Sequence, residues 1–158
     1  MNPAKLNRRL FMGAAILTGL TSGACARTQP SRNLAVFKTP TCACCDAWIT
    51  HMRDAGFTTN ITVLPSLQSV RSSRGLPDAF ASCHTGLIDG YLVEGHVPAQ
   101  DVVRLLAERP AAVGIAVPAM PLGSPGMETA QGDKEPYDTL LVLRSGATRV
   151  FARHNQPA

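Results

Sequence analysis

The chain has 158 residues, of which 45% are hydrophobic and 16% are charged, and it carries a formal net charge of +4. This length suits one domain with an adequate core. Three of the basic residues lie within the first nine positions, and no basic patch elsewhere indicates a nucleic-acid partner.

Residues 1–26 have the pattern of an export signal peptide. Lys5, Arg8 and Arg9 form a basic region, an apolar stretch follows at 10–20, and an A-x-A cleavage pattern ends at Ala26. The apolar stretch is shorter than the roughly 20 residues that a membrane span needs, so we expect no membrane span after cleavage. Cleavage removes three of the 15 basic residues and none of the 11 acidic ones, which leaves a single domain, residues 27–158, with a net charge of +1.

Two features leave the export route open. The Arg8-Arg9 pair resembles a twin-arginine signal, although paired arginines are also common in signals of the general secretory route. Cys25 resembles a lipid-modified cysteine. Ser22 stands where such signals usually carry a branched apolar residue, so lipid anchoring at Cys25 is the less favoured interpretation.

Strands and helices are expected to alternate through the first two thirds of the domain. A strand at 34–37 and a turn at 38–41 precede a helix that begins near Cys44 and ends at Gly56. A β-branched strand at 58–64 and a short helix from 65 to about 75 follow. The buried face of the first helix is predicted to hold Cys45, Trp48, Ile49 and Met52.

The second half is expected to begin with a hairpin of strands 85–89 and 91–94 around Gly90. A helix at 98–107 follows, with a buried face of Val102, Val103, Leu105 and Leu106. Residues 110–136 hold five prolines and four glycines and are predicted to form one long loop, a feature that is usually functional or disordered. Residues 140–143 and 148–151 are predicted to form a last strand or hairpin.

This order of elements resembles a thioredoxin-like α/β sandwich, with an added long loop rich in proline, glycine and methionine. In such a fold the junction between the first strand and the first helix is the reactive corner. Cys42, Cys44 and Cys45 fall at that junction.

These three cysteines allow two interpretations. Cys42 and Cys45 form a C-x-x-C pair at a helix start, where the helix N-terminus stabilises a thiolate; such a pair is redox-competent and can also form a structural disulfide. Cys44 adds a third thiolate, and three soft ligands together favour Cu(I), zinc or a metal cluster.

Further candidate ligands lie outside the cluster. Cys83 and His84 are adjacent and could complete a site with four sulfurs and one nitrogen, which suits copper or zinc. His96 is a weaker candidate, with a polar cap before the helix as the alternative. Met120 and Met127 could supply thioethers, ligands that Cu(I) accepts more readily than zinc, or could pack a loop over the domain.

Three other residues, two histidines and a methionine, are not expected to be ligands. His51 and Met52 each lie seven residues beyond a cluster cysteine, about 10 Å along a helix. We therefore expect Met52 in the core and His51 on the surface. His154 is expected to be free in a polar tail.

Four motifs together are similar to one family, the small periplasmic copper-resistance proteins of the CopG type, formerly a domain of unknown function. The similarity spans roughly residues 34–151. The motifs are Lys38-Thr39-Pro40-Thr41-Cys42-x-Cys44-Cys45, Ala81-Ser82-Cys83-His84-Thr85, Gly90-Tyr91-x-Val93-Glu94-Gly95-His96-Val97-Pro98 and Met120-Pro121-x-Gly123-Ser124-Pro125-Gly126-Met127-Glu128.

The resemblance implies a thioredoxin-like fold, a periplasmic location and copper bound by cysteines. The copper could be bound as several ions in one cluster. The resemblance also implies Cys42, Cys44, Cys45, Cys83 and His84 as ligands. The expected function is therefore copper binding in copper tolerance, with copper ions and periplasmic copper-handling proteins as partners. Mixed sulfur and nitrogen ligation can support both Cu(I) and Cu(II), so a redox role stays open, while a conventional enzyme is not expected.

Two alternatives remain. One is a thiol–disulfide oxidoreductase that uses Cys42 and Cys45; against it, the segment near Cys83 offers a cysteine and a histidine where a proline loop usually faces the motif. The other is a structural zinc domain, which does not account for the two methionines of the long loop.

Overall fold

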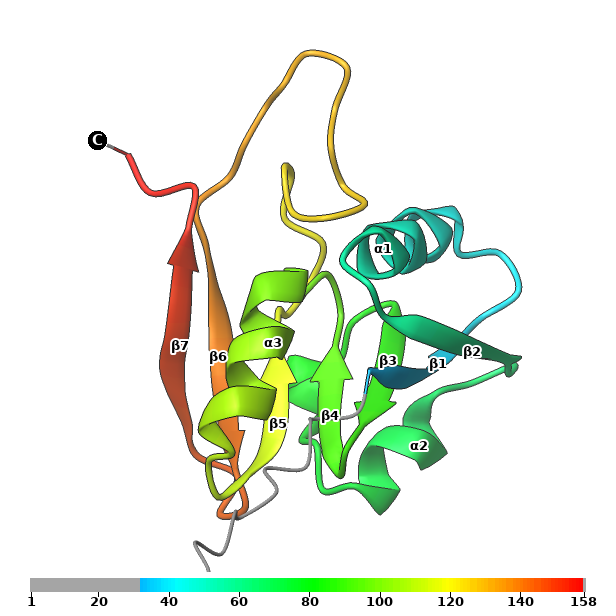
Figure 1. Ribbon diagram of the computed structural model, residues 1–158, viewed down its shortest axis with the longest axis vertical. Helices are drawn as coiled ribbons and strands as arrows, with labels where there is room; N and C mark the ends of the chain where they lie inside the picture. The colour runs from blue at the N-terminus through cyan, green and yellow to red at the C-terminus, as the bar shows by residue number, and fades with distance from the viewer. Residues whose placement is uncertain (1–31, 158) are drawn as a thin grey trace, which may run out of the picture.

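The computed structural model describes residues 32–157. The predicted signal peptide and Cys25 lie outside these residues. Between residues 32 and 157 the chain forms one mixed sheet with the strand order β2-β1-β3-β4-β5-β6-β7 (Figure 1). The elements are β1 Asn33–Lys38, α1 Ala43–Asp54, β2 Thr58–Val63, α2 Gln68–Ser73, the 3-10 helix η1 Asp78–Phe80, β3 His84–Ile88, β4 Tyr91–Glu94, α3 Ala99–Glu108, β5 Ala112–Ala116, β6 Tyr137–Leu143 and β7 Thr148–His154.

The first four strands confirm the predicted α/β class. β1 and β2 are parallel and are joined through α1, whereas β3 lies antiparallel to both β1 and β4. Crossover through a helix is the usual connection of parallel strands, and a short turn is the usual connection of antiparallel ones. The order β2-β1-β3-β4 is compatible with the thioredoxin-like description, which stays an expectation.

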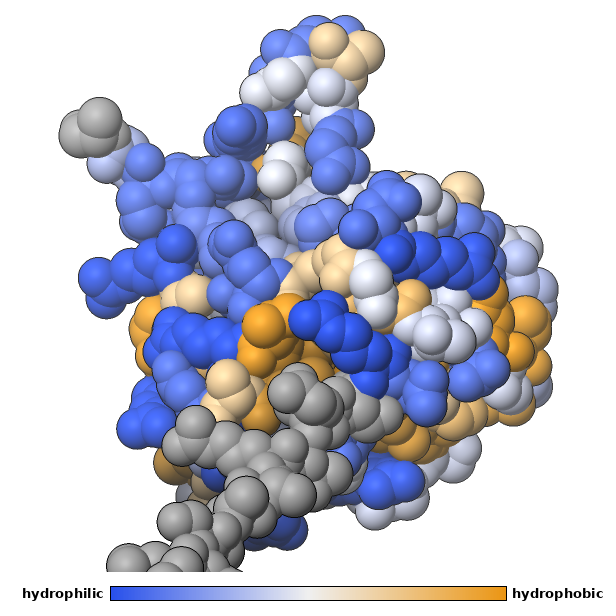
Figure 2. Space-filling view, in the orientation of Figure 1, coloured by the Kyte–Doolittle hydropathy of each residue, from blue (hydrophilic) through white to orange (hydrophobic). Residues whose placement is uncertain are grey.

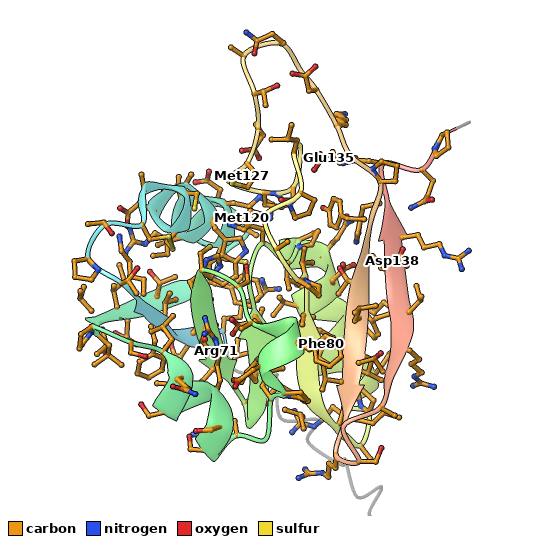
Figure 3. All side chains as sticks on the ribbon, turned by 180° about the vertical axis from the view of Figure 1, so that it is seen from behind. Arg71, Phe80, Met120, Met127, Glu135 and Asp138 are labelled. Carbon is orange, nitrogen blue, oxygen red and sulfur yellow. A yellow bond between two sulfur atoms is a disulfide. The ribbon has the colours of Figure 1, made fainter. Side chains whose placement is uncertain are left out.

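The helices divide between the two faces of the sheet. α1 and α3 bury apolar side chains in the larger core, among them Trp48, Met52 and Val102, which are all fully buried. A smaller cluster on the other face includes Leu76 and Leu92, with Phe80 packed against it. Figure 3 shows α2 and Phe80 on the face opposite to α3. The α1 face predicted from the sequence is confirmed, because helical spacing placed its four apolar residues on the same side.

The predicted loop over residues 110–136 is wrong in its first part. Residues 112–116 form β5, which pairs with β4 in parallel and with β6 in antiparallel orientation. Glycine is required at 114, because a Cβ atom there would lie 1.8 Å from the carbonyl oxygen of Leu92. Glycine and proline usually interrupt strands, so this short buried strand was not predicted from the sequence.

Three side-chain predictions are also wrong. Val103 is 40% exposed, since it lies off the buried face of α3. His51 is not a free surface residue: its Nε2 accepts a hydrogen bond of 3.0 Å from the backbone N–H of Ala99 and so caps α3. His154 belongs to β7 and not to a free tail, because its Nε2 lies 2.8 Å from the Asp101 carboxylate.

The surface seen in Figure 2 is mixed: hydrophilic residues lie over β7, hydrophilic and hydrophobic residues alternate over α3, and hydrophobic ones reach the surface near β2. The exposed residues of β2 include Ile61 and Val63. Between residues 32 and 157, no helix has both the length and the apolar character needed to cross a membrane.

Candidate metal centre

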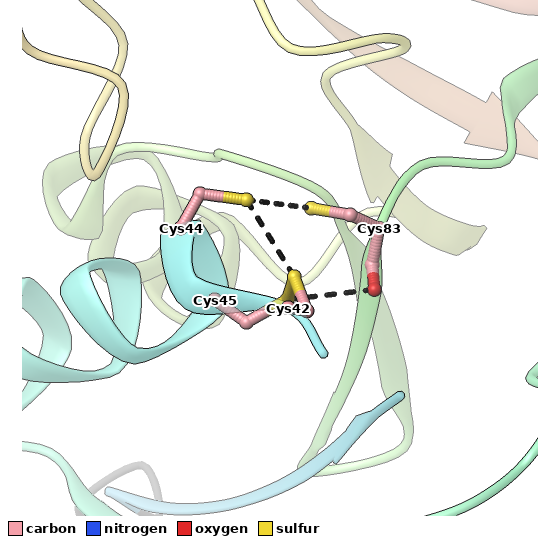
Figure 4. Close-up of side chains that lie close together, drawn as sticks. All are labelled: Cys42, Cys44, Cys45 and Cys83. Carbon is pink, nitrogen blue, oxygen red and sulfur yellow. Dashed lines mark hydrogen bonds between the residues drawn. A yellow bond between two sulfur atoms is a disulfide. The ribbon is translucent and has the colours of Figure 1, made fainter. Parts of the chain in front are cut away.

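The N-terminus of α1 carries the cysteine cluster, as predicted. Cys42 is the N-cap residue of α1 and forms a disulfide with Cys45, whose side chain is fully buried. The structure therefore has the disulfide that the sequence left as an alternative. Cys44 is a free thiol one residue before Cys45, and its Sγ lies 3.5 Å from the Sγ of Cys42 (Figure 4).

Cys83 lies beside this cluster, although 38 residues separate it from Cys45. Its Sγ is 3.8 Å from the Sγ of Cys44, and its carbonyl oxygen is 3.5 Å from the Sγ of Cys45 (Figure 4). Antiparallel pairing of β1 with β3 brings the two segments together, because it sets Lys38, just before the cluster, opposite His84. The structure thus joins the two cysteine segments that the sequence analysis proposed.

Two buried histidines lie on the other side of Cys83. Its Sγ is 3.2 Å from Nδ1 of His84 and 3.0 Å from Nε2 of His96, and both rings are fully buried. Nδ1 of His96 lies 2.8 Å from the carbonyl oxygen of Pro125. Donation from Nδ1 to that oxygen leaves the Nε2 lone pair facing Cys83, an arrangement typical of histidine ligands. His96 was a weaker candidate in the sequence and is as close to Cys83 as His84 is.

The two imidazoles are held in the neutral form that a ligand needs. Burial lowers the pKa of His84 to about 3, and the neighbouring His96 adds to this effect. Burial also lowers the pKa of His96. In contrast, burial and the adjacent Cys44 raise the pKa of the Cys83 thiol to about 12. A metal ion would have to displace the Cys83 proton, so binding would be coupled to proton release.

The donor set fits a soft or borderline metal ion. Four sulfur atoms, of Cys42, Cys44, Cys45 and Cys83, lie within 4.8 Å of one another, and Cys83 forms a second group with His84 and His96 at the same spacing. Nε2 of His84 is buried without a hydrogen-bond partner among the described residues. The nitrogen that faces Cys83 is Nδ1, so in the neutral ring Nδ1 can offer its lone pair while Nε2 carries the proton. Reduction of the disulfide would be required before all four sulfurs could act as thiolates.

The two methionines of the long loop differ in position. Met120 is 49% exposed and lines an open pocket of about 650 Å³ with Cys42, Cys44 and Cys83. Met127 is partly buried and does not line this pocket. Figure 3 shows both at the base of the loop, on the α1 side. Met120 therefore stands at the mouth of the site, while no close approach of Met127 to the sulfurs is observed.

Arg71 and Glu94 were not identified from the sequence as site residues. Glu94 is fully buried, and its carboxylate lies 2.8 Å from Nε of Arg71, a partner on α2. Burial raises the pKa of the Glu94 carboxyl, and its hydrogen bonds with Thr85 and Ser82 oppose that rise. The signal was present in the sequence, since Glu94 lies in one of the four motifs, but only the fold shows its partner.

The long loop also packs closely on α1. Gly126 has a positive φ of +85°, and a Cβ atom there would lie 2.7 Å from the backbone nitrogen of Trp48 and 2.8 Å from the carbonyl oxygen of Cys44. Trp48 in turn donates a hydrogen bond of 2.8 Å to the carbonyl oxygen of Val97, and its ring lies 4.2 Å from that of His84. The loop, α1 and the histidines are thus one packed unit.

Comparison with known proteins identifies the family. The family DUF411, described as "protein of unknown function", matches residues 80–127. Two solved structures named copper resistance protein CopG, form 1 and form 2, are similar over most of the chain. Form 1 is 41% identical, with a TM-score of 0.75, and the match covers 81% of this chain and all of that one. Form 2 is 43% identical, with a TM-score of 0.73, and the match covers 77% of this chain and 97% of that one.

The chain belongs to the CopG family of copper resistance proteins. The resemblance seen in the sequence motifs is therefore confirmed. The DUF411 match includes Cys83, His84, His96 and both loop methionines, and the structural matches extend over most of the remainder. No curated protein matches the sequence.

Proposed function

We propose that this protein is a periplasmic copper-binding protein that acts in copper tolerance. In its reduced form it binds Cu(I) through the thiolates of Cys42, Cys44, Cys45 and Cys83, with His84 and His96 as nitrogen ligands. The observation that carries the proposal is the meeting of four sulfur atoms from two distant segments within 4.8 Å. The names of the related structures, copper resistance proteins, support copper as the metal.

Sulfur chemistry favours copper over the hard cations. Thiolates select Cu(I), zinc or iron–sulfur clusters, whereas carboxylate and carbonyl sites suit magnesium and calcium. Three cysteines within four residues cannot all point at one ion as easily as they can bridge several, so we propose more than one Cu(I) per chain. The exposed thioether of Met120 at the mouth of the pocket adds a ligand that zinc does not favour.

The histidine side of the site broadens its chemistry. Imidazole suits copper in either oxidation state, and Cys83 is shared between the sulfur group and the histidine group. When bound, copper would supply one-electron redox chemistry. The protein residues would hold it in a buried setting, with neutral imidazoles and with Met120 at the opening. Storage, delivery and a change of oxidation state are all compatible with this arrangement.

Titration of the reduced protein with Cu(I), in competition with a Cu(I) chelator, tests the proposal. We expect saturation above one ion per chain and a preference for Cu(I) over Zn²⁺. Saturation at a single ion would contradict the cluster, and stronger binding of Zn²⁺ would favour the structural zinc alternative.

The Cys42–Cys45 disulfide supports a second candidate function. A disulfide at a helix N-terminus is the arrangement of thiol–disulfide oxidoreductases. Against this candidate, the Sγ atoms of Cys44 and Cys83 lie close by, where they would offer competing partners. A copper cluster requires the Cys44 thiolate, whereas an oxidoreductase that uses Cys42 and Cys45 does not.

A further inference from the structure

We infer that Arg71 and Glu94 are positioning residues that hold Cys83 and His84 in the metal centre. The inference rests on the proposed function, and neither residue is a metal ligand in it. Arg71 comes from α2 and Glu94 from the end of β4, both outside the two segments that carry the cysteines. Figure 3 places Arg71 on the α2 side of the sheet.

Arg71 and Glu94 form an ion pair, and its hydrogen bonds are made with the residues that flank Cys83 and His84. Oε1 of Glu94 accepts a hydrogen bond of 2.8 Å from Nε of Arg71 and one of 2.7 Å from the backbone N–H of Ser82. Its Oε2 accepts one of 2.6 Å from the hydroxyl of Thr85. The Arg71 guanidinium also donates to the carbonyl oxygen of Ser82. Ser82 and Thr85 directly precede and follow Cys83-His84, so the ligand pair is fixed at both ends.

Folding stability alone does not account for this pair. Glu94 is fully buried and the Arg71 side chain is only 13% exposed. Removing two charges from water costs several kcal/mol per ion, and well-packed apolar residues often replace such a pair without loss of stability. The fork of the guanidinium and the two carboxylate oxygens, however, specify one geometry for the backbone at Ser82. An apolar pair could fill the space but could not orient that backbone.

The same segment also anchors the loop at the mouth of the site. The hydroxyl of Ser82 donates a hydrogen bond of 2.7 Å to the carbonyl oxygen of Ala119, the residue before Met120. Arg71 and Ser82 both line the pocket beside Cys83. The buried carboxylate of Glu94 therefore fixes the Cys83 backbone. Through Ser82 it also fixes the long loop at Ala119, just before Met120. Outer-shell groups of this kind typically change metal affinity by about 10–100-fold.

Glu94→Gln tests the inference at nearly constant size. The amide carries no charge, and its single carbonyl oxygen cannot occupy both carboxylate positions. It can accept from Arg71 and Ser82 at one position or from Thr85 at the other, and its NH2 group then takes the remaining position. Asp101→Asn is the matched control, because Asp101 is also a buried carboxylate in a polar network, with Thr139 and His154, away from the cysteines. In the reduced protein, with Cu(I) held by a chelator as the probe, we expect Glu94→Gln to weaken binding by at least about tenfold and Asp101→Asn by less than about twofold.

A copper-free measurement separates positioning from metal binding. The alkylation rate of Cys83 relative to Cys44 in the reduced protein, followed by mass spectrometry, reports how the Cys83 thiol is presented. We expect this ratio to change at least threefold in Glu94→Gln and to stay at the wild-type value in Asp101→Asn. A wild-type protein that binds no Cu(I) would refute the proposed function, whereas the alkylation ratio would still decide the role of Glu94.

Arg71→Lys provides a second test, and it carries the decision if Glu94→Gln does not fold. Lysine keeps the charge but lacks the fork that joins Glu94 to Ser82, so we expect the same direction of change in copper affinity and in the alkylation ratio. An unchanged alkylation ratio in the folded variants would overturn the inference. So would a loss of Cu(I) affinity in Glu94→Gln no greater than that in Asp101→Asn.

Discussion

The Sγ atom of Cys83 lies 3.0 Å from Nε2 of His96 while it also lies 3.8 Å from the Sγ of Cys44. Cys83 therefore stands between two sets of donors, the other three cysteines and the two histidines.

This position predicts a large effect of Cys83→Ala. Removal of its thiolate takes a ligand from both donor sets and leaves water, a poor ligand for Cu(I). We expect Cu(I) affinity to fall at least as far as in Cys44→Ser, and beyond the roughly tenfold loss typical of outer-shell changes. His84→Ala is expected to cost less. Chelator competition measures all three variants, and wild-type affinity in Cys83→Ala would show that this cysteine is only structural.

Cys44→Ser separates the two candidate functions. A copper cluster needs the Cys44 thiolate, whereas an oxidoreductase needs only the Cys42–Cys45 pair. We expect the variant to lose Cu(I) stoichiometry and to fail to restore copper tolerance in cells that lack the gene. Disulfide reductase activity is the second readout. If that activity is substantial in the wild type and survives the change, with tolerance intact, the oxidoreductase function is favoured.

The buried histidines predict that acid destabilises the metal-free protein. The folded-state pKa of His84 is about 3, below its unfolded value of 6.5, so the unfolded chain binds a proton that the folded chain excludes. The contribution to stability is complete above pH 6.5 and decreases as the pH falls toward 3. Between pH 7.5 and 5 we expect the free energy of unfolding to fall by about 2 kcal/mol from His84 alone.

Urea unfolding at several pH values measures this loss. His84→Gln is the appropriate variant, since glutamine does not titrate in this range, and it should flatten the dependence between pH 6.5 and 3. His51 and His96 have pKa values shifted in the same direction by burial, so some dependence should remain. Equal slopes in the variant and the wild type would show that His84 is not the group responsible.

Gly126→Ala is predicted to disturb the loop and the site together. The new Cβ would meet the backbone of α1, at a φ of +85° that disfavours alanine. We expect unfolding free energy to fall by about 1–3 kcal/mol. Copper affinity should also fall, because the neighbouring Pro125 carbonyl holds the ring of His96.

Gly132→Ala is the matched control for this change. Gly132 has a similar φ of +75°, but its Cβ would meet nothing within 4 Å. Thermal and urea unfolding should show the backbone strain alone, with copper affinity unchanged. If the two alanine variants behave alike, the close approach of the loop to α1 is not required.

The sequence predicted the elements whose periodicity was clear. The face of α1 with Trp48 and Met52 followed from helical spacing, and the cysteine cluster fell at its N-terminus as expected. β5 was missed, because its glycine and the prolines around it are residues that usually break strands. Its neighbour β4 requires that glycine for close approach, a reason that appears only in the folded sheet.

The candidate ligands could be proposed from the sequence, whereas the residues that support them could not. Soft donors such as Cys44 and Cys83 indicate their chemistry by residue type. The roles of Arg71 and Glu94 depend on a contact across 23 residues, and neither residue type indicates a metal centre. The capping role of His51 likewise depends on the packing of α1 against α3, which the local sequence does not contain.

The pairing of β1 with β3 gives the candidate metal centre an order of assembly. Cys42, Cys44 and Cys45 are neighbours in any conformation of the chain, whereas Cys83 and the histidines join them only when the sheet has formed. Under the proposed function, a chain that crosses the membrane unfolded would carry an incomplete donor set and would complete its copper site only after export. A chain exported in the folded state could instead leave the cytoplasm already loaded.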